Sequence, residues 1–161
     1  YCWFSLIKSP FLIKIDAIMV NKFNIRVYGI WQKGNKILVS HENIDGFEML
    51  KLPGGGLEFG EGPKDCVVRE FAEELGVNVV VQDLLHTTEN FVQSAFRKNE
   101  QVIAIHYRVH CDEEIKSYNT IQATNVGRQN IHHFEWRELD NELMAQFTFE
   151  MDRAALRKLS I

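Results

Sequence analysis

Two apolar segments rich in β-prone residues stand close together after the first twenty residues. They cover residues 23–31 and 36–42, and the polar stretch between them contains Gly34-Asn35. This dipeptide is typical of the tight turns that join antiparallel strands. The pattern therefore predicts a β-hairpin.

The following stretch, residues 49–63, carries too many turn residues for the interior of a strand or a helix. Five glycines and two prolines fall within it, so we predict a loop that folds back tightly. A helix should follow. Pro63 suits its first position with Gly62 as the cap, and Gly76 suits the position just beyond its end.

The rest of the chain alternates between apolar and polar segments. Residues 78–91 and 101–111 are typical of strands, and a polar loop is expected from about residue 112 to residue 130. A last strand over residues 130–139 and a closing helix over residues 151–160 complete the prediction. Strands dominate, so the fold class is mixed α and β.

Composition and charge narrow the function. A chain of 161 residues suits one domain with a buried core. The net charge of −4 gives no support for a nucleic-acid-binding surface. Cys2, Cys66 and Cys111 form no CxxC pair, which favours reduced thiols in a cytoplasmic environment.

The N-terminal residues 1–18 are apolar without forming a membrane span. Two lysines, one aspartate and Pro10 interrupt them, and the basic start and cleavage site of a signal peptide are missing. The first methionine is Met19. We expect residues 1–18 to be an extension and residues 19–161 to be the functional domain, although an added strand or a contact in a homodimer is the alternative.

Candidate chemistry lies on the predicted helix. At 100° per residue, Glu70, Glu73 and Glu74 share one face. The opposite, apolar face carries Val68, Phe71, Ala72 and Leu75. Like charges at this spacing repel each other by about a few tenths of a kcal/mol per pair, so the acidic face is either solvated or functional.

The glycine-rich stretch before the helix favours the interpretation that the acidic face is functional. Helix N-termini and glycine-rich backbone attract phosphate oxygens, whereas a site made of acids repels them. The two features become compatible when a hard divalent cation such as Mg²⁺ lies between the carboxylates and a phosphate.

Residues 55–77 resemble the signature of the Nudix hydrolase family, G-x5-E-x7-R-E-U-x-E-E-x-G-U, where U is a bulky apolar residue. The fixed positions are filled by Gly55, Glu61, Arg69, Glu70, Phe71, Glu73, Glu74, Gly76 and Val77. The resemblance implies an α/β (α+β) fold, a three-layer α/β/α sandwich around a mixed β-sheet.

The resemblance also implies a reaction. Nudix enzymes use Mg²⁺ or Mn²⁺ to hydrolyse a diphosphate linkage in a nucleoside diphosphate joined to another group. Nucleotide sugars, ADP-ribose, oxidised nucleoside triphosphates and dinucleoside polyphosphates all remain open as substrates. The implied site residues are the metal ligands Glu70, Glu73 and Glu74, the supporting Glu61, the orienting Arg69, and Gly55 or Gly56, whose carbonyl can add a ligand.

Two questions stay open at this point. Many family members have a further carboxylate before the last strand, but residues 125–133 contain no acid. The candidates are Glu100, Glu113, Glu114 or no outside acid at all. The alternative functions are a Nudix-fold sensor that binds a nucleotide without cleaving it and a scaffold domain whose helix binds structural cations.

Overall fold

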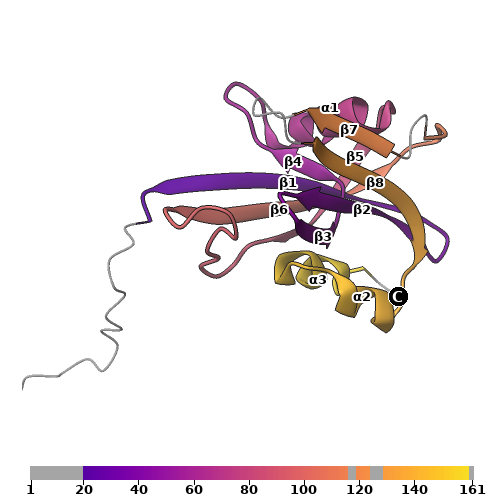
Figure 1. The fold of residues 1–161 in the computed structure, drawn as a ribbon. Helices are drawn as coiled ribbons and strands as arrows, with labels where there is room; N and C mark the ends of the chain where they lie inside the picture. Colours follow the sequence, from indigo (N-terminus) through magenta and orange to yellow (C-terminus); the bar gives the residue numbers. More distant parts are fainter. Residues whose placement is uncertain (1–19, 116–118, 124–128, 160–161) are drawn as a thin grey trace, which may run out of the picture.

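The computed structural model describes residues 20–115, 119–123 and 129–159, which form three layers. A mixed sheet lies between α1 (Pro63–Leu75) on one face and α2 (Asn141–Gln146) and α3 (Glu150–Leu156) on the other (Figure 1). This confirms the fold class expected from the sequence. The extension expected over residues 1–18 lies outside the described residues.

Eight strands make up the sheet within the described residues. They are β1 (Lys22–Lys33), β2 (Lys36–Ile44), β3 (Phe47–Lys51), β4 (Gly54–Gly56), β5 (Val80–Thr87), β6 (Glu100–His110), β7 (Asn119–Ala123) and β8 (Gln129–Glu138). Their order is β5-β6-β1-β2-β8-β7, with β3 on β2 and β4 on β1. Strands β1 and β6 run parallel and the other pairs are antiparallel.

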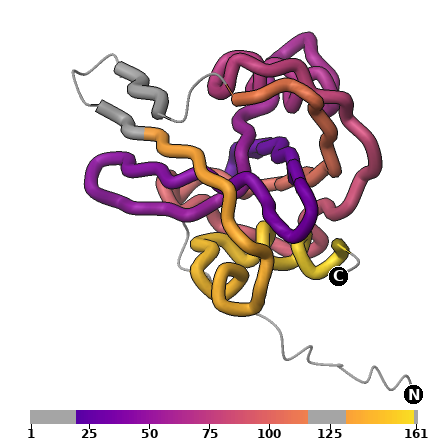
Figure 2. Tube along the Cα trace, turned by 90° about the vertical axis from the view of Figure 1, so that its right-hand side faces the viewer, coloured from indigo at the N-terminus to yellow at the C-terminus, as the bar shows by residue number. Residues whose placement is uncertain are grey.

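Strands β1 and β2 form the predicted hairpin, but they pair only beside its turn. Gly34 adopts a φ of 60° there, and the two pairs are Gln32 with Ile37 and Lys33 with Lys36. Farther along, β1 pairs with β4 and β2 pairs with β3. The sheet therefore divides into two halves that separate away from the turn, as the tube in Figure 2 also shows.

Two apolar clusters fill the space on either side of the sheet. The cluster under α1 contains Val67, Phe71 and Leu75 together with Trp31 of β1. The second cluster joins α2 and α3 to the other face of the sheet. Phe71 and Leu75 are buried as predicted, but Ala72 is exposed, because only one stripe of α1 reaches the sheet.

Gly29 of β1 lies against Phe71 and leaves no space for a methyl group. A Cβ at this position would lie 2.6 Å from Phe71 Cε2 and 3.2 Å from Val109 Cγ1. Both neighbours are buried, so Gly29→Ala should lower the free energy of unfolding by about 2 kcal/mol through overpacking. Chemical denaturation measures this loss. Gly56→Ala, whose Cβ would meet no heavy atom nearer than 3.7 Å, should cost far less.

The loop prediction for residues 49–63 is wrong in part. Strand β3 continues to Lys51, and Gly54–Gly56 form β4. The glycines that suggested a loop allow this strand to lie close to β1, because a Cβ on Gly54 would collide with the carbonyl of Val27. Gly54 also has a φ of 135°, which side chains rarely permit.

Two further elements were not predicted. The expected polar loop from residue 112 to residue 130 contains β7, which pairs with β8. Pairing with an existing strand stabilises this short segment, which has little β-propensity of its own. Helix α2 begins after Asp140, whose carboxylate accepts a hydrogen bond from the Leu143 N–H at 2.7 Å.

None of the helices in the described residues has the length and apolar character needed to cross a bilayer.

Candidate functional site

Helix α1 spans the predicted residues and has the predicted ends. Gly62 is its N-cap in an extended conformation and Pro63 is its first residue. The Gly62 N–H donates to Asp65 Oδ2 at 3.1 Å. Gly76 ends the helix in the left-handed conformation, with a φ of 68°, and donates to the Ala72 carbonyl. These ends fix which residues of α1 face the glycine-rich strand β4.

Arg69 is the centre of the hydrogen-bond network on this side of α1. Its guanidinium donates to both Glu61 oxygens, at 2.7 and 3.0 Å, and to Glu70 Oε1 at 3.0 Å. It also donates to Glu73 Oε2 at 3.3 Å and to the Gly56 carbonyl at 3.0 Å. One side chain therefore connects the loop before α1, two of the three glutamates and β4.

Glu61 is a fixed anion in this network. Hydrogen bonds from Arg69, together with one from the Glu58 N–H, lower the pKa of Glu61 to about 2. The bidentate pair in turn holds the pKa of Arg69 above its usual range. The structure brings these two residues into contact, and the supporting and orienting roles expected of them stay a prediction.

Glu70 lies directly against Gly55 of β4. A Cβ on Gly55 would collide with the Glu70 carboxylate, so the absence of a side chain leaves the space that the carboxylate fills. Burial, and then the negative charge of Glu74, raises the pKa of Glu70 although Arg69 acts in the opposite direction. A divalent cation fits this arrangement, because it would neutralise carboxylates that repel one another.

The three glutamates differ in their surroundings. The side chain of Glu73 is 60% exposed, whereas those of Glu70 and Glu74 are 13% and 5% exposed. The structure thus places Glu73 at the solvent edge and Glu74 at the inner end of the acidic face. The sequence predicted one shared face but not this gradient of burial.

An inner group of charged residues lies next to Glu74. His132 Nδ1 of β8 is 3.4 Å from Glu74 Oε1 and 3.5 Å from Glu42 Oε1 of β2. Lys51 Nζ of β3 forms an ion pair with Glu42 Oε1 at 2.6 Å and donates to the Gly54 carbonyl. Burial opposes both charges, but their attraction outweighs it: the pKa of Glu42 is lowered and that of Lys51 is raised.

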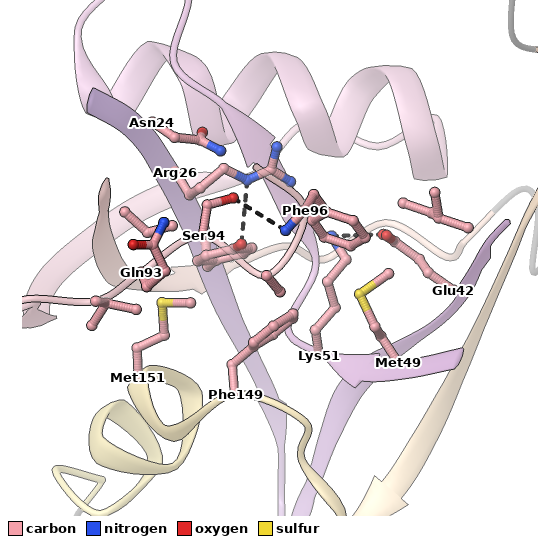
Figure 3. A pocket seen from close by; sticks show the side chains of 15 residues that line it. Asn24, Arg26, Glu42, Met49, Lys51, Gln93, Ser94, Phe96, Phe149 and Met151 are labelled. Atoms are coloured by element: carbon pink, nitrogen blue, oxygen red, sulfur yellow. Dashed lines mark hydrogen bonds and ion pairs between the residues drawn. The ribbon is translucent and has the colours of Figure 1, made fainter. Parts of the chain in front are cut away.

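A cavity of about 210 Å³ opens beside these charges. Arg26, Lys51 and Glu42 line its polar side, and Phe149, the N-cap of α3, and Met151, in the first turn of α3, border it from the opposite side of the sheet to α1 (Figure 3). The remaining lining residues are Asn24, Tyr28, Ile44, Met49, Val92, Gln93, Ser94, Ala95, Phe96 and Val102. The cavity is mainly apolar with two cations at one wall, which suits a flat organic group attached to phosphates.

A second, more open cavity of about 490 Å³ adjoins the first. Both cavities are lined by Asn24, Arg26, Ile44 and Phe96, whereas Phe23 and Gly56 line the second one alone. Arg26 therefore stands between two spaces on the side of β1 that pairs with β4.

Of the acids proposed outside the signature, Glu100 lines the second cavity, whereas Glu113 and Glu114 line neither cavity. Glu113 accepts a hydrogen bond from the Asn78 N–H, and Glu100 pairs with Arg97. The outside carboxylate that the structure brings beside Glu74 is instead Glu42. Sequence reasoning missed Glu42 and Lys51. For Glu42 the available signal was a charge inside a β-prone segment, because a buried charge in a strand needs a partner. Lys51 gave no such signal, because it falls in the stretch predicted to be a loop.

His132 and His133 point to opposite sides of β8: His132 is buried near Glu74, and the His133 ring lies 5.9 Å from that of His41. Cys66 is buried beside Arg69 and the Gly56 carbonyl. Burial, followed by the charge of Glu61, raises the pKa of Cys66 to about 12, so it is a protonated residue of the core.

Comparison with known proteins agrees with the signature. The family model of the NUDIX domain matches residues 21–157. An ADP-ribose pyrophosphatase of Methanocaldococcus jannaschii is 42% identical over 62 residues, which are 38% of this chain and 37% of that protein. An 8-oxo-dGTP diphosphatase of Escherichia coli is 37% identical over 60 residues, which are 36% of this chain and 46% of that protein. Less than half of each relative's length is therefore matched.

A solved structure extends the match to nearly the whole fold. The MutT NUDIX hydrolase from Burkholderia pseudomallei is similar with a TM-score of 0.64 and 20% identity, over 87% of this chain and 100% of that chain. At this identity the similarity concerns the fold.

Proposed function

The chain belongs to the Nudix family, and on this basis we propose that it is a pyrophosphohydrolase that depends on a divalent cation. It would cleave a diphosphate linkage in a nucleoside diphosphate joined to another group. The observation that carries the proposal is the Arg69 network, which gathers Glu61, Glu70 and Glu73 beside the Gly56 carbonyl.

The cation would be Mg²⁺ or Mn²⁺, held by Glu70, Glu73 and Glu74 with the carbonyl of Gly55 or Gly56. When bound, it neutralises the diphosphate and lowers the pKa of the attacking water. The protein's own contribution is to fix the carboxylates. Arg69, itself held by Glu61, directs Glu70 and Glu73, and the missing side chain of Gly55 admits the Glu70 carboxylate to β4.

The substrate would bind across Arg26. The smaller cavity would take the nucleoside base among Met49, Phe149 and Met151, and Arg26 and Lys51 would meet phosphate oxygens. The second cavity shares Arg26 and offers room for another group beyond the phosphates. This favours a two-part compound, such as a nucleotide sugar or ADP-ribose, over a nucleoside triphosphate.

A panel of diphosphate compounds with Mg²⁺ or Mn²⁺ tests the proposal. Chromatography of the products should show a nucleoside monophosphate and the second phosphate-bearing fragment, with two-part compounds hydrolysed faster than triphosphates. Faster hydrolysis of triphosphates would contradict the use of the second cavity. Nucleotide binding without any hydrolysis would identify the chain as a sensor.

Glu73→Gln tests whether the exposed glutamate acts on metal. It keeps the size of the side chain and removes a negative ligand, so turnover should fall at least about tenfold, a barrier increase of about 1.4 kcal/mol. The free energy of unfolding without metal should change by less than about 0.5 kcal/mol, because the lost exposed ion pair with Arg69 offsets the relieved repulsion.

Initial rates on the best compound of the panel, together with thermal unfolding, provide the measurements for Glu73→Gln. The exposed Glu142→Gln on α2 is the matched control and should behave like wild type. Full turnover by Glu73→Gln would remove Glu73 from the ligand set.

We further propose that the functional domain comprises residues 19–161 and works in a reducing, cytoplasmic compartment on a small-molecule substrate. The buried free thiols of Cys66 and Cys111 support the assignment of compartment.

A further inference from the structure

Three side chains from separate elements converge at the inner end of the acidic face. Glu42 comes from β2, His132 from β8 and Glu74 from α1, and one potential ligand atom of each lies within 4.8 Å of the other two. All three are buried. The site therefore depends on the tertiary fold and differs from the acidic face, whose glutamates all belong to one helix.

His132 gives the second indication of a ligand. Its side chain is only 7% exposed, and Nδ1 makes no hydrogen bond although carboxylate oxygens lie 3.4 and 3.5 Å away. A buried polar atom without a hydrogen bond destabilises the folded protein. A cation between the imidazole and the carboxylates would satisfy this atom with geometry that neither oxygen provides alone.

The side chains around the cluster keep an excess of negative charge even when Lys51 is counted. In the Arg69 network and the inner charged group, taken together with Arg26, carboxylates outnumber lysine and arginine side chains by two. The carboxylates are Glu42, Glu61, Glu70, Glu73 and Glu74, and the basic side chains are Arg26, Lys51 and Arg69. The excess equals the charge of one divalent ion. Lys51 Nζ and His132 Nδ1 both approach Glu42 Oε1, at 2.6 and 3.5 Å, so a bound ion would share this carboxylate with Lys51.

We propose that Glu42, His132 and Glu74 form a divalent-cation site, with His132 Nδ1 as a nitrogen ligand. Imidazole suits transition metals better than Mg²⁺, so the site prefers Mn²⁺ to Mg²⁺. The proposal rests on the proposed function only in sharing Glu74 with the acidic face. Residues 125–133 contain no acid that could bind the ion. Glu42 on β2 and His132 on β8 would then be the ligands from outside the signature.

Electron spin echo envelope modulation on the full chain with Mn²⁺ and without nucleotide tests the site. Modulation from a directly bound nitrogen is expected for wild type. It should disappear in His132→Gln, and the affinity for Mn²⁺ should fall at least about tenfold. The affinity for Mg²⁺ should fall much less. His133→Gln is the matched control, because this neighbour lies on the opposite side of β8 against His41.

Absence of nitrogen modulation in wild type would overturn the proposal, as would its persistence in His132→Gln. Either result would mean that His132 is not a ligand of the ion. Thermal unfolding without metal checks that His132→Gln is folded, and Glu42→Gln provides a second variant with the same expected loss of Mn²⁺ affinity. None of these measurements depends on hydrolysis, so they test the cation site even if the chain proves not to be a hydrolase.

Discussion

Gly55→Ala should reduce diphosphate hydrolysis by about 100-fold, because a small displacement of a group in the site has an effect of this size. The new methyl group would occupy the space of the Glu70 carboxylate. Glu70 would then have to leave its position beside Arg69. The reduction corresponds to an increase of about 2.7 kcal/mol in the activation barrier.

The chain should still fold, which separates this effect from unfolding. The backbone at Gly55 is not left-handed, and the displaced group is the end of a flexible side chain. Steady-state kinetics should show lower turnover for Gly55→Ala. Calorimetric titration with the cation should show weaker cation binding. Gly56→Ala keeps its carbonyl and should lose far less activity. Wild-type turnover in Gly55→Ala would show that the position of Glu70 is not required.

Arg69→Lys should lower turnover by about 10- to 100-fold, the usual effect of removing a group that orients metal ligands. Lysine keeps the positive charge but replaces the planar fork with a single ammonium group. It cannot donate at once to Glu61, Glu70 and Glu73, so the carboxylates would lose their common direction. Arg69→Gln, which also loses the charge, should be at least as impaired.

Kinetics of the two Arg69 variants show whether Arg69 acts by orienting the carboxylates or only by neutralising their charge. If the charge alone mattered, Arg69→Lys would keep wild-type turnover and only Arg69→Gln would fail. Arg157→Gln removes an exposed arginine that pairs with Glu150 on α3, and it should leave turnover close to that of wild type.

The helix and its acidic face were predictable because their determinants are local. Pro63 and Gly76 fix the ends of α1, and the spacing of Glu70, Glu73 and Glu74 fixes their shared face. Each of these statements needs only the geometry of one helix. The burial of Glu74 was not predictable in this way, because it depends on the strands that cover the inner end of the helix.

The inner charged group was missed for the same reason. Glu42, Lys51 and His132 lie on three strands, and they meet only because β2 pairs with both β3 and β8. No spacing along the chain encodes that order of strands. Strand β4 was missed because glycine density normally indicates a loop, whereas here the lack of side chains permits close approach to β1.

The charged residues of the site and the walls of the smaller cavity come from different parts of the chain, and this affects how such a protein can evolve. The carboxylates and Arg69 belong to one continuous stretch, whereas the walls of the smaller cavity come in part from residues 92–96 and from Phe149 and Met151. Substitutions in those two distant segments can alter the shape of the cavity without touching α1. In the proposed hydrolase, selection could therefore act on ligand preference and on bond cleavage almost independently, and a new preference would need no reconstruction of the proposed hydrolytic centre.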